Sequence, residues 1–158
     1  MTPMTPLEDR LALRALGDEY AFAVDERDVD RFTQVFTDDG ELAIFEPADA
    51  EPARVYRGRE ELQTILELVA VFSATFHLMA NHACRVDGDR AEGVTYCLAH
   101  HLTEPADAPA HDTVMLIRYE DRYVRVADGW RFARRNVMRQ WTEHHAADRA
   151  PMFPPVRP

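Results

Sequence analysis

The chain has 158 residues, which is enough for one ordinary domain with a buried core. Its 28 acidic and 18 basic residues give a formal net charge of −10, and this excess of negative charge opposes binding to a nucleic-acid backbone or an anionic membrane. The sequence has no apolar run of the roughly 18 residues that span a bilayer and no secretory pattern at its N-terminus, so we expect a cytoplasmic protein without nucleic-acid or membrane partners.

Helix signals dominate the first half of the chain. A capping box from Thr5 to Glu8 predicts a helix that begins at Pro6 and continues to about Asp25. A short second helix follows Asp28 and stops at the turn residues 38–40. The hydrophobic pattern then predicts, in chain order, a strand over 41–45, a proline- and acid-rich loop over 46–54 and a third helix over 59–72.

Strand signals dominate the second half. Apolar runs bounded by turn and loop signals predict long strands over 75–86, 90–103, 112–126 and 130–142. Helices followed by a run of strands are typical of an α+β fold, in which the N-terminal helices pack on one face of a curved antiparallel sheet. We therefore expect a single domain over 1–158, with its core at about 7–142 and a proline-rich tail over 146–158.

His77 is an ionisable side chain in an otherwise apolar strand pattern. The turn signal at Asp87 and Gly88 predicts a hairpin between the first two long strands. If these two residues form the centre of the turn, His77 lies opposite Leu98. Register therefore predicts the neighbours of His77.

Polar side chains gather around His77 in this register. His100 lies diagonally from it on the same face, about 7–8 Å away, within reach of one small molecule. A slip of one residue would exchange His100 for His101. The other polar side chains predicted on that face are Asn81 and Tyr96. The two histidines predicted on the opposite face, with structural or interface roles, are His82 and His101.

Asp25 and Tyr20 stand near the end of the first predicted helix. Helical periodicity places Asp25 beside apolar side chains, so its carboxyl group must be paired, protonated or close to solvent. It either caps the helix end or orients His77 and makes the free ring nitrogen basic. Tyr20 lies about 140° around an ideal helix from Asp25. It is either a packed aromatic residue or, if the helix end bends, a second polar group of the site.

Simpler interpretations stand beside the catalytic one. His77 alone could be a hydrogen-bonded core histidine. Arg125 and Arg139, late in the last two strands, could be surface residues or could hold an anionic substrate. Histidines and an aspartate could also bind zinc or iron, but no two histidines have the spacing of a metal site on one strand face. We therefore expect no metal and no other cofactor.

Five segments form a combined pattern: the helical segment 11–25, the start of the third helix at 56–62, Thr75-Phe76-His77, the turn at 86–91 and the segment 119–132. This pattern spans about residues 7–142 and resembles the SnoaL-like branch of the nuclear transport factor 2-like superfamily, with its scytalone dehydratase-like and bile acid dehydratase-like members. The resemblance implies a cone-shaped α+β domain whose helices and bent sheet enclose an apolar pocket. It also implies a homodimer or a higher homo-oligomer.

The resemblance implies site residues as well. Dehydratases of this branch have an aspartate at the end of the first helix and a histidine that opens the first long strand, and these positions match Asp25 and His77. Further site positions of the branch correspond to Tyr20, His100, Arg125 and Arg139.

Together these features predict a cofactor-independent lyase or isomerase for a small, apolar, oxygenated substrate such as a polyketide, a terpenoid or a steroid-like compound. His77 is expected to act as general base or acid with Asp25 as its orienting partner. Dehydration is the first choice of reaction, before isomerisation and cyclisation. The alternatives are a non-catalytic module that binds a small ligand and an auxiliary subunit of an oxygenase. Tyr20 and His100 are expected to polarise a carbonyl or a leaving hydroxyl, and the expected substrate contacts are Asn81, Tyr96, Arg125 and Arg139.

Overall fold

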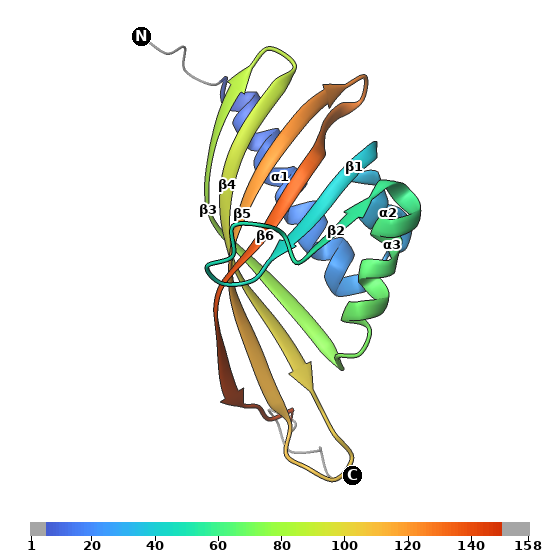
Figure 1. The fold of residues 1–158 in the computed structure, drawn as a ribbon, viewed down its shortest axis with the longest axis vertical. Coiled ribbons are helices and arrows are strands. Elements are labelled where there is room, and N and C mark those ends of the chain that lie inside the picture. Colours follow the sequence, from blue (N-terminus) through green and yellow to red (C-terminus); the bar gives the residue numbers. More distant parts are fainter. Residues whose placement is uncertain (1–5, 150–158) are drawn as a thin grey trace, which may run out of the picture.

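A computed structural model describes residues 6–149 and confirms the predicted α+β class, with helices on one face of a strongly bent sheet (Figure 1). Thr5 and residues 150–158, which the sequence assigned to a helix cap and to most of the tail, lie outside the described residues. None of the described helices is long and apolar enough to cross a membrane. The helices are α1 (Leu7–Glu26), α2 (Val29–Gln34) and α3 (Gly58–Val69); the strands are β1 (Phe36–Phe45), β2 (Arg54–Arg57), β3 (Ala74–Asp87), β4 (Arg90–Thr103), β5 (His111–Val126) and β6 (Gly129–Ala146).

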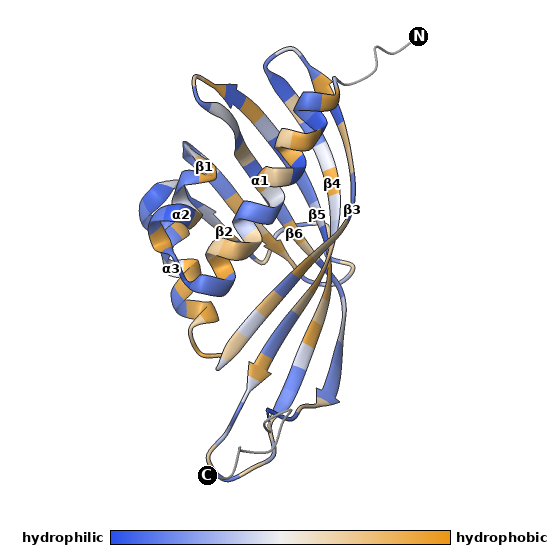
Figure 2. Cartoon of the chain, turned by 180° about the vertical axis from the view of Figure 1, so that it is seen from behind, coloured by the Kyte–Doolittle hydropathy of each residue, from blue (hydrophilic) through white to orange (hydrophobic). Residues whose placement is uncertain are grey.

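The strands form one sheet in the order β2-β1-β6-β5-β4-β3. Neighbouring strands run antiparallel except β1 and β6, which pair in parallel. We call the face that carries α1 the inner face and the opposite face the outer face. In both views the helices cover only part of the inner face, and β4, β5 and β6 extend beyond the C-terminal end of α1 (Figure 1 and Figure 2).

Two strand predictions require correction. β1 begins at Phe36 and not at residue 41, because residues 38–40 lie inside the strand, at an irregularity in its register with β6. Gly40 permits this close approach, since a Cβ atom there would lie 2.9 Å from the Phe36 Cβ atom. The sequence also missed β2, which pairs with β1, because four residues are too few to show a strand period.

One hydrophobic core joins α1 to the inner face. Leu13 and Val24 of α1 are fully buried. The Tyr20 ring packs between helix and sheet, with its centroid 5.5 Å from that of Phe32 and 5.8 Å from that of Tyr119. This packing fixes α1 on the sheet and thereby determines where the end of the helix meets β3.

An ion pair lies inside this core. Arg135 of β6 and Asp121 of β5 are both 0% exposed, and two guanidinium nitrogens donate to the two carboxylate oxygens at 2.9 Å. Tyr123 donates a third hydrogen bond to Asp121. The guanidinium also stacks on the rings of Tyr20 and Tyr119. The remaining nitrogen, Nη1, has no hydrogen-bond partner among the described residues. Removal of either partner would therefore leave a buried charge uncompensated.

Asp121→Asn is expected to lower the free energy of unfolding by about 3–5 kcal/mol, because Arg135 then stays charged and unpaired in the core. The matched control is Glu92→Gln, since the Glu92 and Arg85 side chains are 65% and 72% exposed and such surface pairs stabilise little. Urea unfolding of both variants measures the difference. If Asp121→Asn were as stable as Glu92→Gln, the buried pair would not support the core.

Candidate active site

Asp25 and His77 meet where the end of α1 packs against the start of β3. Asp25 Oδ1 accepts hydrogen bonds from the Thr75 hydroxyl at 2.9 Å and from His77 Nδ1 at 2.7 Å, and Oδ2 accepts one from the His77 backbone N–H at 2.9 Å. The His77 and Asp25 side chains are only 6% and 19% exposed. The fold thus brings together two candidate residues that are 52 positions apart in the chain.

The Asp25 carboxyl group is ionised at neutral pH. Burial by itself raises its pKa, because apolar surroundings disfavour the charge. The hydrogen bonds from the His77 ring and backbone, the charge of His77 and the bond from Thr75 outweigh burial and hold the pKa below its usual range. Asp25 can therefore only accept, so the ring hydrogen of neutral His77 stands on Nδ1, and Nε2 is free to take a proton.

Two features change the register from the predicted one. The turn is centred on Gly88 and Asp89, because Asp87 pairs with Arg90, and not on Asp87 and Gly88; this moves the register by two residues and leaves the faces unchanged.

β3 also contains a bulge that the sequence register omitted. Met79 and His82 are three residues apart, but their partners in β4 are only two residues apart, so the residues between them include an extra one. Arg14 of α1 anchors the bulge, because its guanidinium donates to the carbonyl oxygens of Met79 and Ala80. The extra residue shifts the register by one and exchanges the faces of the strand on its two sides.

The predicted register is therefore wrong at His77, which lies opposite Ala99 and not Leu98. His101, and not His100, shares the inner face with His77, and the two ring centroids are 5.6 Å apart. His101 is 6% exposed. The second histidine beside His77 is thus the one that the sequence had assigned to the opposite face.

His101 is held as a neutral ring with a defined tautomer. Its Nδ1 lies 3.0 Å from the carbonyl oxygen of Ala99 and 3.3 Å from that of Thr113. Carbonyl oxygens only accept, so Nδ1 carries the hydrogen and Nε2 is an acceptor. Burial and the nearby His77 lower the pKa of His101, which favours the neutral form. The Phe72 ring packs against it at 4.7 Å between centroids.

His100 forms a separate pair on the outer face. Its Nδ1 lies 2.6 Å from Asp112 Oδ2, and its side chain is 38% exposed. It lies opposite Phe76, whose own side chain is exposed on that face. The prediction that His100 acts with His77 is wrong, because the shifted register places the two on opposite sides of the sheet.

Asn81 and Tyr96 do not lie beside His77 either. Asn81 is exposed within the bulge, and Tyr96 is 46% exposed on the outer face. His82 faces inward after the bulge, where burial and the charge of Arg14 lower its pKa. Its Nε2 atom is buried and has no hydrogen-bond partner among the described residues. A strand pattern without a bulge assigns all of these residues to the wrong face.

Tyr20 belongs to the aromatic core. α1 remains helical to Glu26, so its end does not unwind in the way that would turn Tyr20 toward Asp25. Burial raises the pKa of Tyr20 to about 12, although the stacked Arg135 opposes this shift. The packing gives no support to the prediction that Tyr20 polarises a substrate.

Arg125 has structural partners instead of a place in the site. It donates to Asp9 at 3.0 Å and lies over the Trp130 ring at 4.3 Å. Asp9 stands about 24 Å along α1 from Asp25 at the usual helical rise. Arg125 therefore holds the beginning of α1 on the sheet. The prediction that it contacts the substrate is wrong.

Arg139 lies opposite Ile117, so register places it on the same face as His77. Its guanidinium pairs with Glu46 and donates to Thr142 at 3.0 Å. β6 and β3 are separated by three strand spacings, about 14 Å. A substrate contact by Arg139 stays a prediction.

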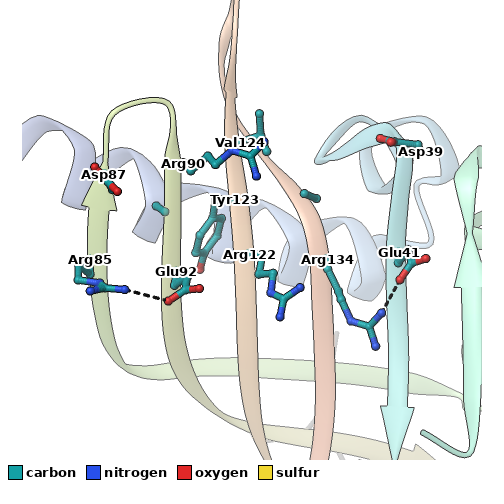
Figure 3. Close-up of a pocket in the computed structure, with 12 residues that line it drawn as sticks. Asp39, Glu41, Arg85, Asp87, Arg90, Glu92, Arg122, Tyr123, Val124 and Arg134 are labelled. Carbon is teal, nitrogen blue, oxygen red and sulfur yellow. Dashed lines mark hydrogen bonds and ion pairs between the residues drawn. The ribbon is translucent and has the colours of Figure 1, made fainter.

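Two surface hollows, of about 610 and 500 Å³, are lined by a mixture of charged and uncharged residues that does not include Asp25 or His77. In Figure 3, α1 lies behind the strands from which the charged side chains of the larger hollow project, so this hollow is on the outer face. It is therefore not the apolar pocket that the resemblance implied.

Among residues 6–149, no group of three His, Cys, Asp or Glu residues is placed to hold a metal ion. A row of successive register partners crosses the larger hollow: Arg85, Glu92, Arg122, Arg134 and Glu41.

A family model described as a SnoaL-like domain matches residues 5–136. The chain is also 28% identical over 137 residues to the uncharacterized protein Rv2910c of Mycobacterium tuberculosis strain H37Rv. That match covers 85% of this chain and 88% of the relative.

Several solved structures share the fold. The Kfla4162 protein of Kribbella flavida is 25% identical with a TM-score of 0.75, over 86% of this chain and 93% of that one. A protein assigned as a scytalone dehydratase from Novosphingobium aromaticivorans DSM 12444 is 22% identical with a TM-score of 0.75, over 90% and 91%. The hexachlorocyclohexane dehydrochlorinase LinA-type3 of Novosphingobium barchaimii LL02 is 19% identical with a TM-score of 0.73, over 94% and 96%.

The lowered pKa of Asp25 predicts a pH-dependent contribution to stability. This contribution is complete above the carboxyl pKa of the unfolded chain, about 4, and is lost as the pH falls through the lower pKa of the folded protein. The stability margin of wild type over Asp25→Asn should therefore be larger at about pH 5 than at about pH 2. Urea unfolding at a series of pH values measures this margin, and a margin that does not narrow toward low pH would contradict the prediction.

Proposed function

The chain belongs to the SnoaL-like domain family, and from this membership and the geometry at Asp25 and His77 we propose that it is a cofactor-independent acid–base lyase or isomerase. Its substrate is a small, largely apolar, oxygenated molecule of polyketide, terpenoid or steroid-like character, and its reaction is dehydration. The observation that carries the proposal is the 2.7 Å contact between Asp25 Oδ1 and His77 Nδ1, which leaves Nε2 as a proton acceptor.

The names of two structural neighbours support elimination as the reaction class. One is assigned as a scytalone dehydratase, and the other is a dehydrochlorinase. A dehydratase removes water, and a dehydrochlorinase removes hydrogen chloride. Both reactions require a base that takes a proton from carbon, which is the role that the free Nε2 atom of His77 fits.

His77 carries out both proton transfers in this mechanism. Its Nε2 takes the proton from the carbon next to the carbonyl of a β-hydroxy ketone. The C–H electrons form the new double bond as the bond to the β-hydroxyl breaks. The imidazolium returns the same proton to the leaving oxygen, so the products are an enone and water. Asp25 stabilises the imidazolium and keeps the ring oriented throughout.

His101 orients the hydroxyl that leaves. Its Nδ1 hydrogen is already bound by the carbonyl oxygens of Ala99 and Thr113, so only Nε2 is available, as an acceptor. In this proposal Nε2 accepts the hydrogen of the substrate hydroxyl and holds the leaving group beside His77. The 5.6 Å separation of the two ring centroids allows one small molecule to contact both.

The substrate lies on the inner face beyond the end of α1. Register places Ala99 and Met115 beside His77 on that face, and both are apolar. Arg139 stands on the same face across the sheet, where its guanidinium, which pairs with Glu46, could also donate a hydrogen bond to an oxygen at the far end of an elongated substrate.

The central test is turnover of candidate β-hydroxy ketones by wild type, His77→Ala and Asp25→Asn. His77→Ala is expected to lower kcat/KM by about 10²–10⁴, because it removes the group that transfers the proton. Asp25→Asn is expected to lower it as well, because a neutral amide does not stabilise the imidazolium. Equal turnover by wild type and His77→Ala would remove His77 from the mechanism. Binding of the ketones by wild type without turnover would favour the ligand-binding alternative.

Substitutions of the adjacent residues His100 and His101 provide a matched pair of variants. His101→Ala is expected to lower kcat/KM by about tenfold, because the substrate hydroxyl loses one acceptor. His100→Ala removes the same side chain from the next position but on the outer face, and activity should stay at the wild-type level. The same steady-state assay measures both. The reverse order of effects would contradict the assignment of His101 to the site.

We also propose that the outer face pairs with a second copy of the chain. Large apolar side chains are exposed there, including Phe76 at 64% and Trp141 at 55%. Arg122 and Arg134 lie directly opposite each other across β5 and β6. Glu41 pairs with Arg134, whereas Arg122 has no ion-pair partner among the described residues. In this proposal a carboxylate of the second, acidic copy pairs with Arg122.

Trp141→Glu is therefore expected to shift the protein from dimer to monomer. The matched control is Leu11→Glu, which changes an apolar residue of similar exposure, 61%, on α1 instead of the outer face. Size-exclusion chromatography with light scattering measures the mass of each variant. A monomeric wild type, or an equal effect of both substitutions, would contradict the proposed contact.

A further inference from the structure

Arg27 occupies a backbone conformation that ordinarily favours glycine. It is the residue after α1, and its φ of 55° and ψ of 35° are left-handed. Glycine adopts this conformation at a helix end without steric cost, whereas a residue with a Cβ atom does not. The arginine side chain must therefore contribute contacts that offset the unfavourable backbone.

The Arg27 guanidinium binds oxygens from three segments around the Asp25–His77 pair. Nη1 donates to the Asp25 backbone carbonyl at 2.6 Å and to the Thr75 hydroxyl at 3.2 Å. Nη2 donates to the Phe72 carbonyl at 3.2 Å. These partners belong to the end of α1, to β3 and to the connection between α3 and β3. Arg27 thus links all the segments that meet at Asp25.

The Arg27 contact leaves the Thr75 hydroxyl hydrogen available to the ionised Asp25 carboxylate, which can only accept. A guanidinium has no acceptor, so the Thr75 oxygen must accept from Arg27. The hydroxyl hydrogen then points to Asp25 Oδ1, 2.9 Å away. A hydrogen bond to the carboxylate favours its ionised form over the protonated form. With the two donors of His77, both carboxylate oxygens are occupied by donors.

We propose that Arg27 and Thr75 are positioning residues that hold Asp25 as an ionised carboxylate aimed at His77 Nδ1. Arg27 orients the Thr75 hydroxyl, Thr75 donates to Asp25, and Asp25 in turn fixes the ring hydrogen of His77 on Nδ1. The catalytic consequence, a basic Nε2, rests on the proposed function. The charge state and the tautomer exist in the free protein and need no substrate.

The surroundings of Asp25 make this network necessary. Asp25 lies in the last turn of α1, where the helix dipole disfavours a negative charge. The ionisable groups that face it are His77 of β3, Arg27 beyond the helix end and, across the inner face, Cys97 of β4. Burial raises the pKa of the Cys97 thiol to about 12, so it stays neutral. His101, which faces His77, is neutral as well.

The test uses the isolated protein and a hydroxyl-specific substitution. Thr75→Val preserves shape and strand preference and removes only the hydroxyl. Carbon-13 NMR titration of the Asp25 carboxyl is expected to show a pKa about one unit higher than in wild type. Nitrogen-15 spectra of His77 are expected to show a smaller fraction of the Nδ1–H tautomer. Thr75→Ser restores the hydroxyl and should return both signals to wild-type values.

The Arg27→Gly substitution distinguishes the effect of the arginine side chain from the effect of the left-handed backbone. Glycine suits the left-handed position, so the end of α1 is preserved while the guanidinium is lost. The Asp25 pKa should rise, by less than in Thr75→Val, because the Thr75 hydroxyl remains but loses its orientation. The control for loss of a positive charge is Arg59→Gln, an exposed arginine that pairs with Asp30 and should leave both signals unchanged.

Three outcomes would overturn the proposal: an unchanged Asp25 pKa in Thr75→Val, a Thr75→Ser variant that behaves like Thr75→Val, or an Arg27→Gly variant that matches wild type. Because none of these measurements requires a substrate, absence of ketone turnover would remove the proposed function and leave the positioning network standing. If instead the wild-type enzyme turned over the ketones while every variant kept the wild-type Asp25 pKa and His77 tautomer, the positioning network would be wrong and the proposed function would stand.

Discussion

Two hydrogen bonds from Arg14 to the carbonyl oxygens of Met79 and Ala80 anchor the point at which β3 changes face. Because the bulge lies there, His77 and His82 both point to the inner face although they are five positions apart, an odd spacing that would place them on opposite sides of a regular strand. The identity of the second histidine at the site follows from this shift. With His82 in place, a regular β3 would turn His77 to the outer face, on the side of His100 and away from His101.

Two histidine–aspartate pairs in this fold show why residue types alone do not identify the site. His77 with Asp25 and His100 with Asp112 are both histidine–aspartate pairs, with contacts of 2.7 Å and 2.6 Å. They differ in burial, since the His77 ring is 6% exposed and the His100 ring 38%. The Asp25 carboxylate accepts from three groups, whereas Asp112 accepts from two, the His100 ring and the His101 backbone N–H. Face and burial, which depend on the whole fold, therefore separate a candidate active site from a surface pair.

The sequence could predict the fold class, because its helix signals precede its strand signals. The meeting of Asp25 with His77 was implied by the family resemblance. From its residues alone the sequence left Asp25 either as a helix cap or as the partner of His77. It could not predict the bulge, since its anchor, Arg14, lies 65 residues before Met79 and a two-residue strand period makes no allowance for an extra residue. The roles of Arg27 and Thr75 were equally hidden, because a left-handed arginine has no local sequence signal. Family membership limits the chemistry but does not name the substrate.

β3 is also one edge of the open sheet, and it is 14 residues long. A long, regular edge presents a row of unpaired backbone groups on which a strand from another molecule can add, and such addition leads to aggregation. The extra residue interrupts that row near its middle, and the Arg14 guanidinium occupies two of its carbonyl oxygens. Loss of Arg14 would therefore have two effects. It would loosen the bulge that turns His77 to the inner face, and it would leave two carbonyl oxygens of this edge unpaired near Phe76 and Leu78, whose side chains are exposed.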